Sequence, residues 1–458
     1  MKYLDCGFEY ILSLIDPATP MGREELRAMT FLKRDEDIEA FHKRQLEVNE
    51  RKSQIEPLKS ILARVRDIRG TISNLSPGKI LDDIELFEIK SFAYWSERLR
   101  SEIGECSSWM QLPDLSVVFS FLDPDDVGTE SFYISDKLDN ALAVVRKKLY
   151  RLQRNREEYD ETSLNELIRL NFEIEEKVRA DLSGKLITYR EDLQSSATTI
   201  GKIDLIVALV EFNRKLGLRK PEISSGEYEF EELVNPELAA SLNKSGKNFQ
   251  PFSASFDRRS VIIGGNMTGK SVLLRTVALL QTMFQHGLFV PAKRAFIPVY
   301  DAIVYYSGDK QSFLDGLSSF AGEVDHLKKA LEIVHMDIRG LFLFDEIGRN
   351  TNPVEGPAFL MASAEYLSRN ERCRTILTSH YEEALEIEGA KLFIIKGLDH
   401  ERMRNEIGRE ISYYVDHSLV EIESNAAFPR EAVTIARLMG LDREFVELII
   451  RKLKESCE

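Results

Sequence analysis

The sequence predicts a multidomain α+β protein in which a long all-α region precedes a C-terminal α/β domain with a mainly parallel sheet. Three observations support this prediction. A chain of 458 residues is too long for a single hydrophobic core. Apolar residues recur at helical spacing over most of residues 1–225. From residue 226 onward, short apolar strands alternate with helix-patterned segments, which is the order of a parallel sheet covered by helices.

The composition indicates which kinds of binding partner and which cellular compartment to expect. The formal net charge is -15, which disfavours a general polyanion binder because nonspecific affinity for nucleic acid comes largely from Lys and Arg contacts to phosphate. The four cysteines lack C-x-x-C spacing and indicate ordinary thiols in a reducing compartment. The N-terminal sequence does not have the pattern of a signal peptide. Every apolar stretch is well short of the roughly 20 residues that a membrane-spanning helix needs. We therefore expect a cytoplasmic protein without membrane contact.

Residues 1–133 are expected to form a helical core domain. Phe8, Ile11 and Leu12 repeat at helical spacing, and turn sequences such as Asp16-Pro17 separate the helices. This part of the sequence contains no cluster of catalytic residue types.

Residues 134–225 are expected to form a long helical lever arm. Apolar side chains recur at spacings of four and three, as in the seam of a coiled coil: Leu138, Leu142, Val145, Leu149 and Leu152. A break near Ser183-Gly184 predicts where the chain turns back, and a returning helix is expected from Ile203. The expected product is an arm of antiparallel helices.

The arm also carries a basic cluster that leaves two interpretations open. Its members are Arg146, Lys147, Lys148, Arg151, Arg154 and Arg156. The cluster is either a helix face that contacts nucleic-acid phosphates or a solvated coiled-coil flank paired with acids such as Glu157 and Glu158. The acidic sequence around the cluster favours the second interpretation.

The α/β domain, expected at residues 226–458, contains a glycine-bracketed turn between a strand and a helix. The apolar segment Val261-Ile262-Ile263 precedes the turn, and a helix-patterned segment follows it, as a phosphate-binding loop requires. The turn has the spacing G-x-x-x-x-G-K-S and consists of Gly264, Gly265, Asn266, Met267, Thr268, Gly269, Lys270 and Ser271.

The chemistry of a bound triphosphate explains these residue types. Gly264 and Gly269 let the backbone curl so that its N–H groups face an anion, and the following helix adds its positive end. Lys270 would reach the β- and γ-phosphates, and Ser271 would place a hydroxyl on Mg²⁺. The alternative, a glycine-rich turn in a hydrophobic core, is disfavoured by the flanking pattern. ATP and Mg²⁺ are the expected cofactors.

Two further strands end in polar residues. One apolar run ends at Asp345, expected to hold Mg²⁺ through water, and Glu346, expected to orient or deprotonate the attacking water. Another ends at His380, which would sense the γ-phosphate because ligands of open α/β sheets gather at the carboxyl ends of strands. A hydrogen-bonded structural histidine is the alternative. The position of His380 after the two acids along the chain favours a place in the site. Lys270, Glu346 and His380 are therefore the candidate catalytic residues.

Several segments, in order along the chain, resemble the ATPase motifs of the MutS family. They are Gly264 to Ser271, Gly316 to Glu323, Asp345 to Thr351 and Thr378 to Tyr381. The resemblance implies a P-loop ATPase that pairs with a second copy into a homodimer with composite ATP sites. It further implies that Ser318 approaches the partner's γ-phosphate at a helix N-terminus, and that Phe249 lies near the family's adenine-stacking aromatic residue.

The resemblance is closer to the second MutS subfamily, which lacks a mismatch-reading domain. Thr351 to Gly356 fits that branch, and Met21 to Leu26 resembles the start of the family's helical core. Because only about 20 residues of this sequence precede that start, we expect it to lack the mismatch-recognition and connector domains. The arm is also too short for the family's DNA clamp, and Asn350 replaces the usual glycine.

Two functions follow from this resemblance. The first is a DNA-associated ATPase, a dimeric switch that moves helical arms against mismatched or branched DNA in repair or recombination. The alternative is an ATP-dependent factor that remodels or reactivates a protein partner, such as a cobalamin-dependent aminomutase. A plain metabolic kinase is disfavoured, because the sequence after Lys270 supplies family switch segments instead of an acceptor-binding lid.

Overall fold

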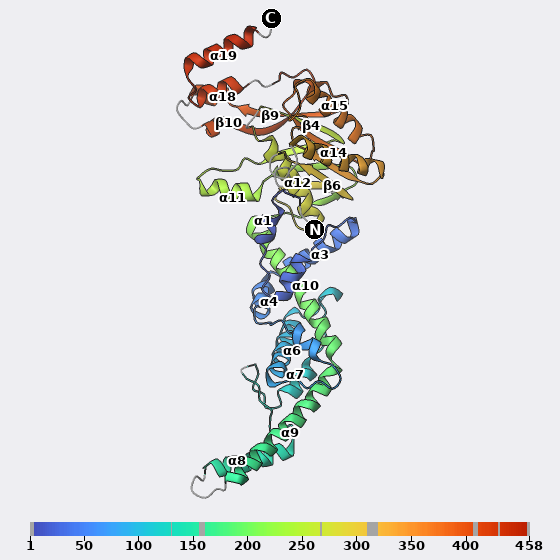
Figure 1. The fold of residues 1–458 in the computed structure, drawn as a ribbon, viewed down its shortest axis with the longest axis vertical. Helices are drawn as coiled ribbons and strands as arrows, with labels where there is room; N and C mark the ends of the chain where they lie inside the picture. The colour runs from blue at the N-terminus through green and yellow to red at the C-terminus, as the bar shows by residue number, and fades with distance from the viewer. Residues whose placement is uncertain are drawn as a thin grey trace. The chain divides into compact units, whose positions relative to one another are not determined.

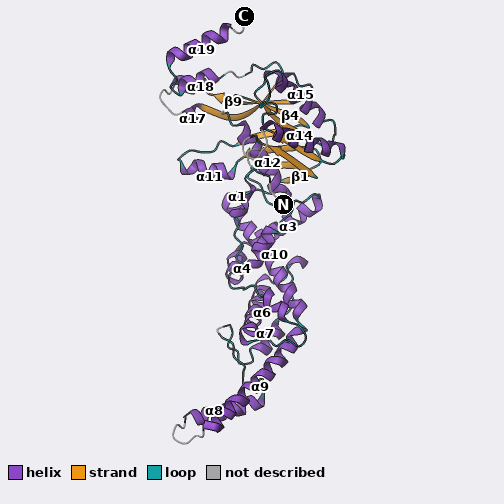
Figure 2. Cartoon of the chain, viewed as in Figure 1, coloured by secondary structure: helices purple, strands orange, loops and turns teal. Residues whose placement is uncertain are grey.

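The computed structural model describes residues 4–129, 131–154, 161–265, 268–308, 319–405, 411–428 and 431–455. The chain divides into two compact units. The sheet unit consists of Met1–Leu14, Thr30–Lys43 and Asn213–Glu458, and the helical unit consists of Ile15–Met29 and Arg44–Phe212. The described strands all belong to the sheet unit (Figure 2). The mixed α/β class predicted from the sequence is confirmed, and the division at residues 133 and 225 stays a prediction.

The larger sheet has six strands in the order β10-β9-β4-β8-β7-β6. Its strands are β4 (Arg259–Ile263), β6 (Ala302–Tyr306), β7 (Gly340–Phe344), β8 (Arg374–Ser379), β9 (Lys391–Leu398) and β10 (Val415–Ile422). Neighbours from β9 to β6 pair in parallel, and β10 pairs antiparallel with β9. All five residues of β7 are buried, as expected for a parallel strand covered on both faces.

A second, mixed sheet of four strands has the order β1-β5-β2-β3. Its strands are β1 (Glu222–Ser224), β2 (Tyr228–Leu233), β3 (Phe252–Phe256) and β5 (Arg294–Pro298). On β2 and β3 buried and more exposed residues alternate, so one face of this sheet is packed. The alternation of strands and helices in the sequence predicts one mainly parallel sheet, and the structure contains this second sheet as well.

Helices cover the six-stranded sheet. Ala330 of α14 (Ser319–His335) and Leu360 of α15 (Glu355–Leu367) share one hydrophobic core with Val261 and Phe342. Helix α12 (Lys270–Gln285) contacts β7 and β8. The other described helices that lie wholly in this unit are α1 (Phe8–Ser13), α11 (Pro236–Lys244), η3 (Glu382–Glu386), α16 (His400–Asn405), α17 (Ile411–Tyr414), α18 (Ala432–Leu438) and α19 (Arg443–Glu455).

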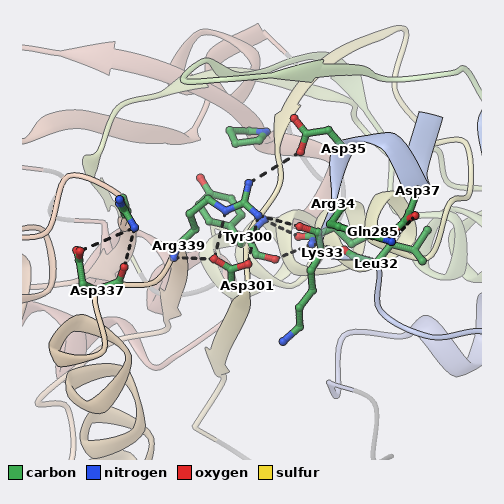
Figure 3. Close-up of polar contacts among 12 residues, drawn as sticks. Leu32, Lys33, Arg34, Asp35, Asp37, Gln285, Tyr300, Asp301, Asp337 and Arg339 are labelled. Carbon is green, nitrogen blue, oxygen red and sulfur yellow. Dashed lines mark hydrogen bonds and ion pairs between the residues drawn. The ribbon is translucent and has the colours of Figure 1, made fainter. Parts of the chain in front are cut away.

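The N-terminal segment 30–43 is hydrogen-bonded to the rest of the sheet unit (Figure 3). The backbone N–H of Leu32 donates to Gln285 O at 2.6 Å, and the Gln285 side-chain amide donates to Leu32 O at 2.7 Å. Arg339, which directly precedes β7, donates to Lys33 O at 2.8 Å and pairs with Asp301 at 3.2 Å. The end of α12 and the start of β7 therefore hold the same short backbone segment.

The helical unit holds α2 (Pro20–Arg27), η1 (Lys52–Gln54), α4 (Ile55–Leu62), α5 (Arg69–Asn74), α6 (Asp83–Ile103), η2 (Ser108–Met110), α7 (Ser116–Leu122), α8 (Asn140–Arg154) and α9 (Glu161–Ile187). Helices α3 (Asp35–Glu50) and α10 (Arg190–Leu216) have residues in both units. Of the described helices, only α10 is long and apolar enough to cross a membrane, and 72% of its apolar window is buried in the protein, as in a core helix.

Within the predicted arm, α8 and α9 lie side by side (Figure 1). Leu142 and Val145 are buried, and Arg146 pairs with Asp136 and Glu175, each at 2.7 Å. The expected break at Ser183-Gly184 is wrong, because α9 continues to Ile187 and α10 already begins at Arg190. The Ser183 hydroxyl donates to Arg179 O inside the helix and accepts from Leu81 N–H, so its polar atom is satisfied within a continuous helix and caps no helix end.

A buried carboxylate organises the start of α2. Thr19 caps the helix by accepting from Gly22 N–H at 2.9 Å, and its own hydroxyl donates to Asp204 at 2.7 Å. The backbone N–H groups of Ala18 and Thr19 also donate to Asp204. A Cβ added to Gly22 would lie 2.8 Å from Asp204 Cγ and 2.9 Å from Pro17 Cβ, so this contact admits no side chain.

We expect Gly22→Ala to lower the free energy of unfolding of the helical unit by about 1–3 kcal/mol, because the new methyl group overpacks the contact with Asp204. Gly70→Ala is the matched control. Gly70 lies in α5 with nothing within 4 Å of an added Cβ, so this variant should be as stable as the wild type or slightly more stable. Urea unfolding followed by circular dichroism measures both changes, and equal midpoints for the two variants would contradict the packing argument.

Candidate active site

The loops that carry the predicted site residues leave the same edge of the six-stranded sheet. Strand β8 lies between β4 and β7, with Ile263 paired to Ser379 and Phe344 to Leu377. Because these strands are parallel, the residues that follow them emerge side by side. The parallel register therefore brings together the glycine-rich loop after β4, the two acids after β7 and His380 after β8.

Lys270, the first residue of α12, lies at the centre of this edge with 4% of its surface exposed. Its ammonium donates to Gly264 O at 2.7 Å and to Gly265 O at 2.9 Å. The Glu346 carboxylate lies 3.2 Å from the same nitrogen. A residue that the sequence placed on phosphate is thus in contact with the predicted water-activating carboxylate.

The backbone of the loop fits the proposed cradle. Gly269 has a φ of 109°, a left-handed conformation that L side chains rarely adopt. A Cβ on Gly264 would lie 3.0 Å from Thr268 Oγ1, whose hydroxyl closes the loop by donating to Gly265 O at 2.9 Å. Glycines at these positions fit a backbone that curls around a phosphate at a helix N-terminus. Asn266 and Met267 lie outside the described residues.

One hydroxyl links the two acids. Thr378 Oγ1 donates to Asp345 Oδ1 at 2.5 Å and accepts from Glu346 N–H at 2.9 Å. Burial raises the pKa of Asp345, while hydrogen bonds from Ser271 and Thr378 oppose that effect. The Ser271 hydroxyl and the Asp345 carboxylate are hard oxygen donors of the kind that hold Mg²⁺, which retains waters and phosphate oxygens as its other ligands. The donor set therefore fits the expected ion.

Glu346 has a φ of 54°, in the left-handed region. Its carboxylate faces Lys270, and Arg349 Nη1 lies 2.9 Å from its other oxygen. His380 Nδ1 lies 3.9 Å from Glu346 and has no hydrogen-bond partner among the described residues. Burial lowers the pKa of His380, although the Glu346 carboxylate opposes this shift, so the ring is held toward its neutral form.

A cavity of about 750 Å³ adjoins the glycine-rich loop. Phe249 lines it together with Thr268, Gly269, Val272 and His417. His417, on β10, donates from Nδ1 to Thr268 O at 2.6 Å and so ties the wall of the cavity to the loop. The volume falls within the range of cavities that take up small molecules.

Three residues that contact the site, Thr378, Glu323 and His417, were given no role from the sequence. Thr378 was included only as the first residue of a motif; it lies on β8, two residues before His380, so the alternation of side chains along a strand could have placed both on the same side. Glu323 was included only as part of a motif, and its carboxylate accepts from Gly348 N–H at 2.6 Å. For His417 no local pattern existed, because its contact with Thr268 depends on the pairing of β10 with β9. Ser318 lies outside the described residues.

Comparison with known proteins identifies relatives of this chain. Residues 260–452 match the family model described as MutS domain V. The chain is 30% identical over 295 residues to a DNA mismatch repair protein MutS of Desulforamulus reducens and 29% identical over 329 residues to that of Aquifex pyrophilus. It is 34% identical over 222 residues to the protein of the same name from Ruminiclostridium cellulolyticum.

The matches cover a larger share of this chain than of the relatives. They include 63%, 71% and 47% of this chain, in the order given, but only 32%, 36% and 24% of the relatives. This chain therefore spans about a third of the length of the relatives that it matches.

We expect Thr378→Val to lower the free energy of unfolding of the sheet unit by about 1–3 kcal/mol, because Asp345 Oδ1 and Glu346 N–H both lose a buried partner. Thr375→Val is the matched control on the same strand. Thr375 Oγ1 is buried and has no hydrogen-bond partner among the described residues, so its removal should cost nothing. Thermal unfolding of both variants measures the difference, and an equal loss for Thr375→Val would contradict the role of the hydroxyl.

Proposed function

This chain belongs to the MutS family, and on that premise we propose that it binds and hydrolyses ATP with Mg²⁺ and uses its nucleotide state to act on DNA. The observation that carries the proposal is the distance of 3.2 Å between Lys270 and Glu346. It joins the end of the glycine-rich loop to the acids after β7 at one edge of the sheet. The relatives are named as DNA mismatch repair proteins, which is the support for DNA as the partner.

In the proposed reaction Lys270 binds the β- and γ-phosphates, with the backbone N–H groups of the loop beside it. Ser271 and Asp345 hold Mg²⁺, which supplies charge neutralisation for the transferred phosphoryl group. Glu346 orients the attacking water and accepts its proton. His380, kept toward its neutral form by burial, offers a hydrogen bond near the γ-phosphate. Lys270 lies 3.2 Å from Glu346 and His380 lies 3.9 Å from Glu346, so in this proposal catalysis rests on how these groups are positioned around the nucleotide.

We also propose that the nucleobase enters the cavity beside Phe249 and stacks on that ring. The support is the position of Phe249 in the wall next to Thr268 and Gly269. The working form in this proposal is a homodimer with composite ATP sites, to which Ser318 of each chain contributes. That part rests on the resemblance of Gly316 to Glu323 to the family's signature segment.

DNA contact would have to be local on a chain with a net charge of -15. Helix α8 offers a candidate surface, because Lys147, Lys148, Arg151 and Arg154 are exposed and have no ion pair in the part of the chain that the structure describes. Arg156 lies outside the described residues. The alternative function, ATP-driven remodelling of a protein partner, is supported by the same acidic charge. It predicts no salt-dependent retention on DNA.

We expect Lys270→Ala to abolish ATP binding, because the buried ammonium is the principal charge available to the phosphates. Glu346→Gln should retain binding within a few fold, while hydrolysis falls by about 10²–10⁴-fold because the general base is removed. Lys293→Ala, an exposed lysine of the same unit, is the control and should behave as wild type. Nucleotide binding by filter retention and phosphate release measure the two steps. Hydrolysis by Glu346→Gln at the wild-type rate would remove Glu346 from its proposed role.

We expect the double variant Lys147→Gln/Arg151→Gln to bind duplex DNA more weakly and to reduce the slope of log affinity against log salt concentration by roughly two. The control, Lys293→Gln/Arg372→Gln, changes the net charge equally with two exposed cations of the sheet unit. Fluorescence anisotropy over a salt series measures both. Equal slopes for the two variants would exclude α8 as the contact, and no binding by the wild type would favour the protein-partner alternative.

A further inference from the structure

The turn that follows Glu346 is held on several sides. Gly348 has a φ of 80°, and a Cβ there would lie 2.6 Å from Gly356 O of α15. Its N–H donates to Glu323 Oε1 at 2.6 Å, and its carbonyl accepts from the Tyr381 hydroxyl at 2.9 Å. Three elements, α14, α15 and the segment after β8, therefore fix the position of one glycine two residues after the catalytic carboxylate.

Glu323 is an unusual residue for this position. Its surface is 2% exposed, and its second oxygen, Oε2, is buried with no hydrogen-bond partner among the described residues. Burial raises the pKa of Glu323, with the Gly348 N–H opposing the shift. No Lys, Arg or His pairs with Glu323 in the described chain, and its carboxyl contact is with a single backbone amide. A buried carboxyl costs stability unless it is satisfied, so packing alone does not explain a glutamate here.

Glu346 needs such support. With a φ of 54° it occupies a left-handed conformation, although it is not a glycine, and such a conformation persists only where the surroundings impose it. Thr378 fixes the N–H of Glu346 on one side. On the other side, Ile347 is buried and Gly348 is held by Glu323 and Tyr381.

We infer that Glu323 and Tyr381 are positioning residues for Glu346: by gripping the N–H and C=O of Gly348 they hold the turn that aims the Glu346 carboxylate at its water. The inference deepens the proposed ATPase function and rests on it. Because Glu323 lies on α14 and Tyr381 follows β8, these two hydrogen bonds to Gly348 also link α14 and the end of β8 to the hydrolytic step.

A positioning role for Glu323 differs from a purely structural one because it requires an acceptor oxygen at residue 323. Glu323→Gln keeps an amide oxygen that can accept from Gly348 N–H, whereas Glu323→Leu has similar size and no acceptor. Glu332→Leu makes the same change at an exposed position of α14 and controls for altered helix surface. Tyr381→Phe removes only the hydroxyl that donates to Gly348 O.

The test measures kcat, KM and ATP affinity for these variants beside the wild type and Glu346→Gln, together with hydrogen exchange of the backbone amides around Gly348. We expect Glu323→Leu to lower kcat by about tenfold to a hundredfold with ATP affinity unchanged, since displacing a reacting group by about 1 Å has an effect of that size. Tyr381→Phe should lower kcat in the same way. Glu323→Gln and Glu332→Leu should stay near the wild-type rate. Exchange at Gly348 should accelerate in Glu323→Leu only.

Each outcome decides one point. Suppose that the wild type hydrolyses ATP and Glu346→Gln does not. If Glu323→Leu then turns over at the wild-type rate, the positioning role of Glu323 is excluded while the ATPase function stands. If Glu323→Gln is as impaired as Glu323→Leu, the carboxyl has another role and the inference is also excluded. If the wild type does not hydrolyse ATP, the proposed function fails, and the inference fails with it.

Discussion

The buried contact between Lys270 and Glu346 is the interaction on which the rest of the site depends. Both side chains are almost fully withdrawn from water, and burying either charge alone would be costly because the partner's attraction would no longer offset its desolvation. The contact exists because β8 lies between β4 and β7 in a parallel register, and α15 forms the helical crossover from β7 to β8 that such a register requires. The contact between these two charges therefore depends on the arrangement of the whole sheet.

The elements that carry these charges are also connected at their far ends. Helix α12 starts at Lys270 and ends at Gln285, and β7 starts after Arg339 and ends before Asp345. Gln285 and Arg339 both hydrogen-bond the backbone at Leu32 and Lys33. A helix and a buried strand are stiff along their axes, so a displacement of one against the other must be accommodated where both hold the same backbone segment.

The sequence predicted the features that are local and missed those that depend on distant contacts. The loop at Gly264 to Ser271 and the acids at Asp345 could be found because their spacing is dictated by the chemistry of a phosphate. The break expected at Ser183-Gly184 failed because α9 runs on to Ile187, and Ser183 bonds Arg179 O and Leu81 N–H within the helix instead of capping a helix end. Folding of segment 30–43 with the sheet unit depends on Gln285, which no local pattern connects to Leu32.

The state of Lys270 in this structure constrains how a nucleotide can bind. An ammonium has three N–H donors, and two of them already donate to Gly264 O and Gly265 O while the Glu346 carboxylate faces the nitrogen at 3.2 Å. A phosphate oxygen that accepts from Lys270 must therefore displace one of these protein acceptors. The Gly264 and Gly265 carbonyls belong to the loop that would have to open around the phosphate. The Glu346 carboxylate, which is negatively charged, repels the phosphate. Binding of an anion at Lys270 thus favours separation of Glu346 from Lys270, which would free the carboxylate for its proposed contact with water.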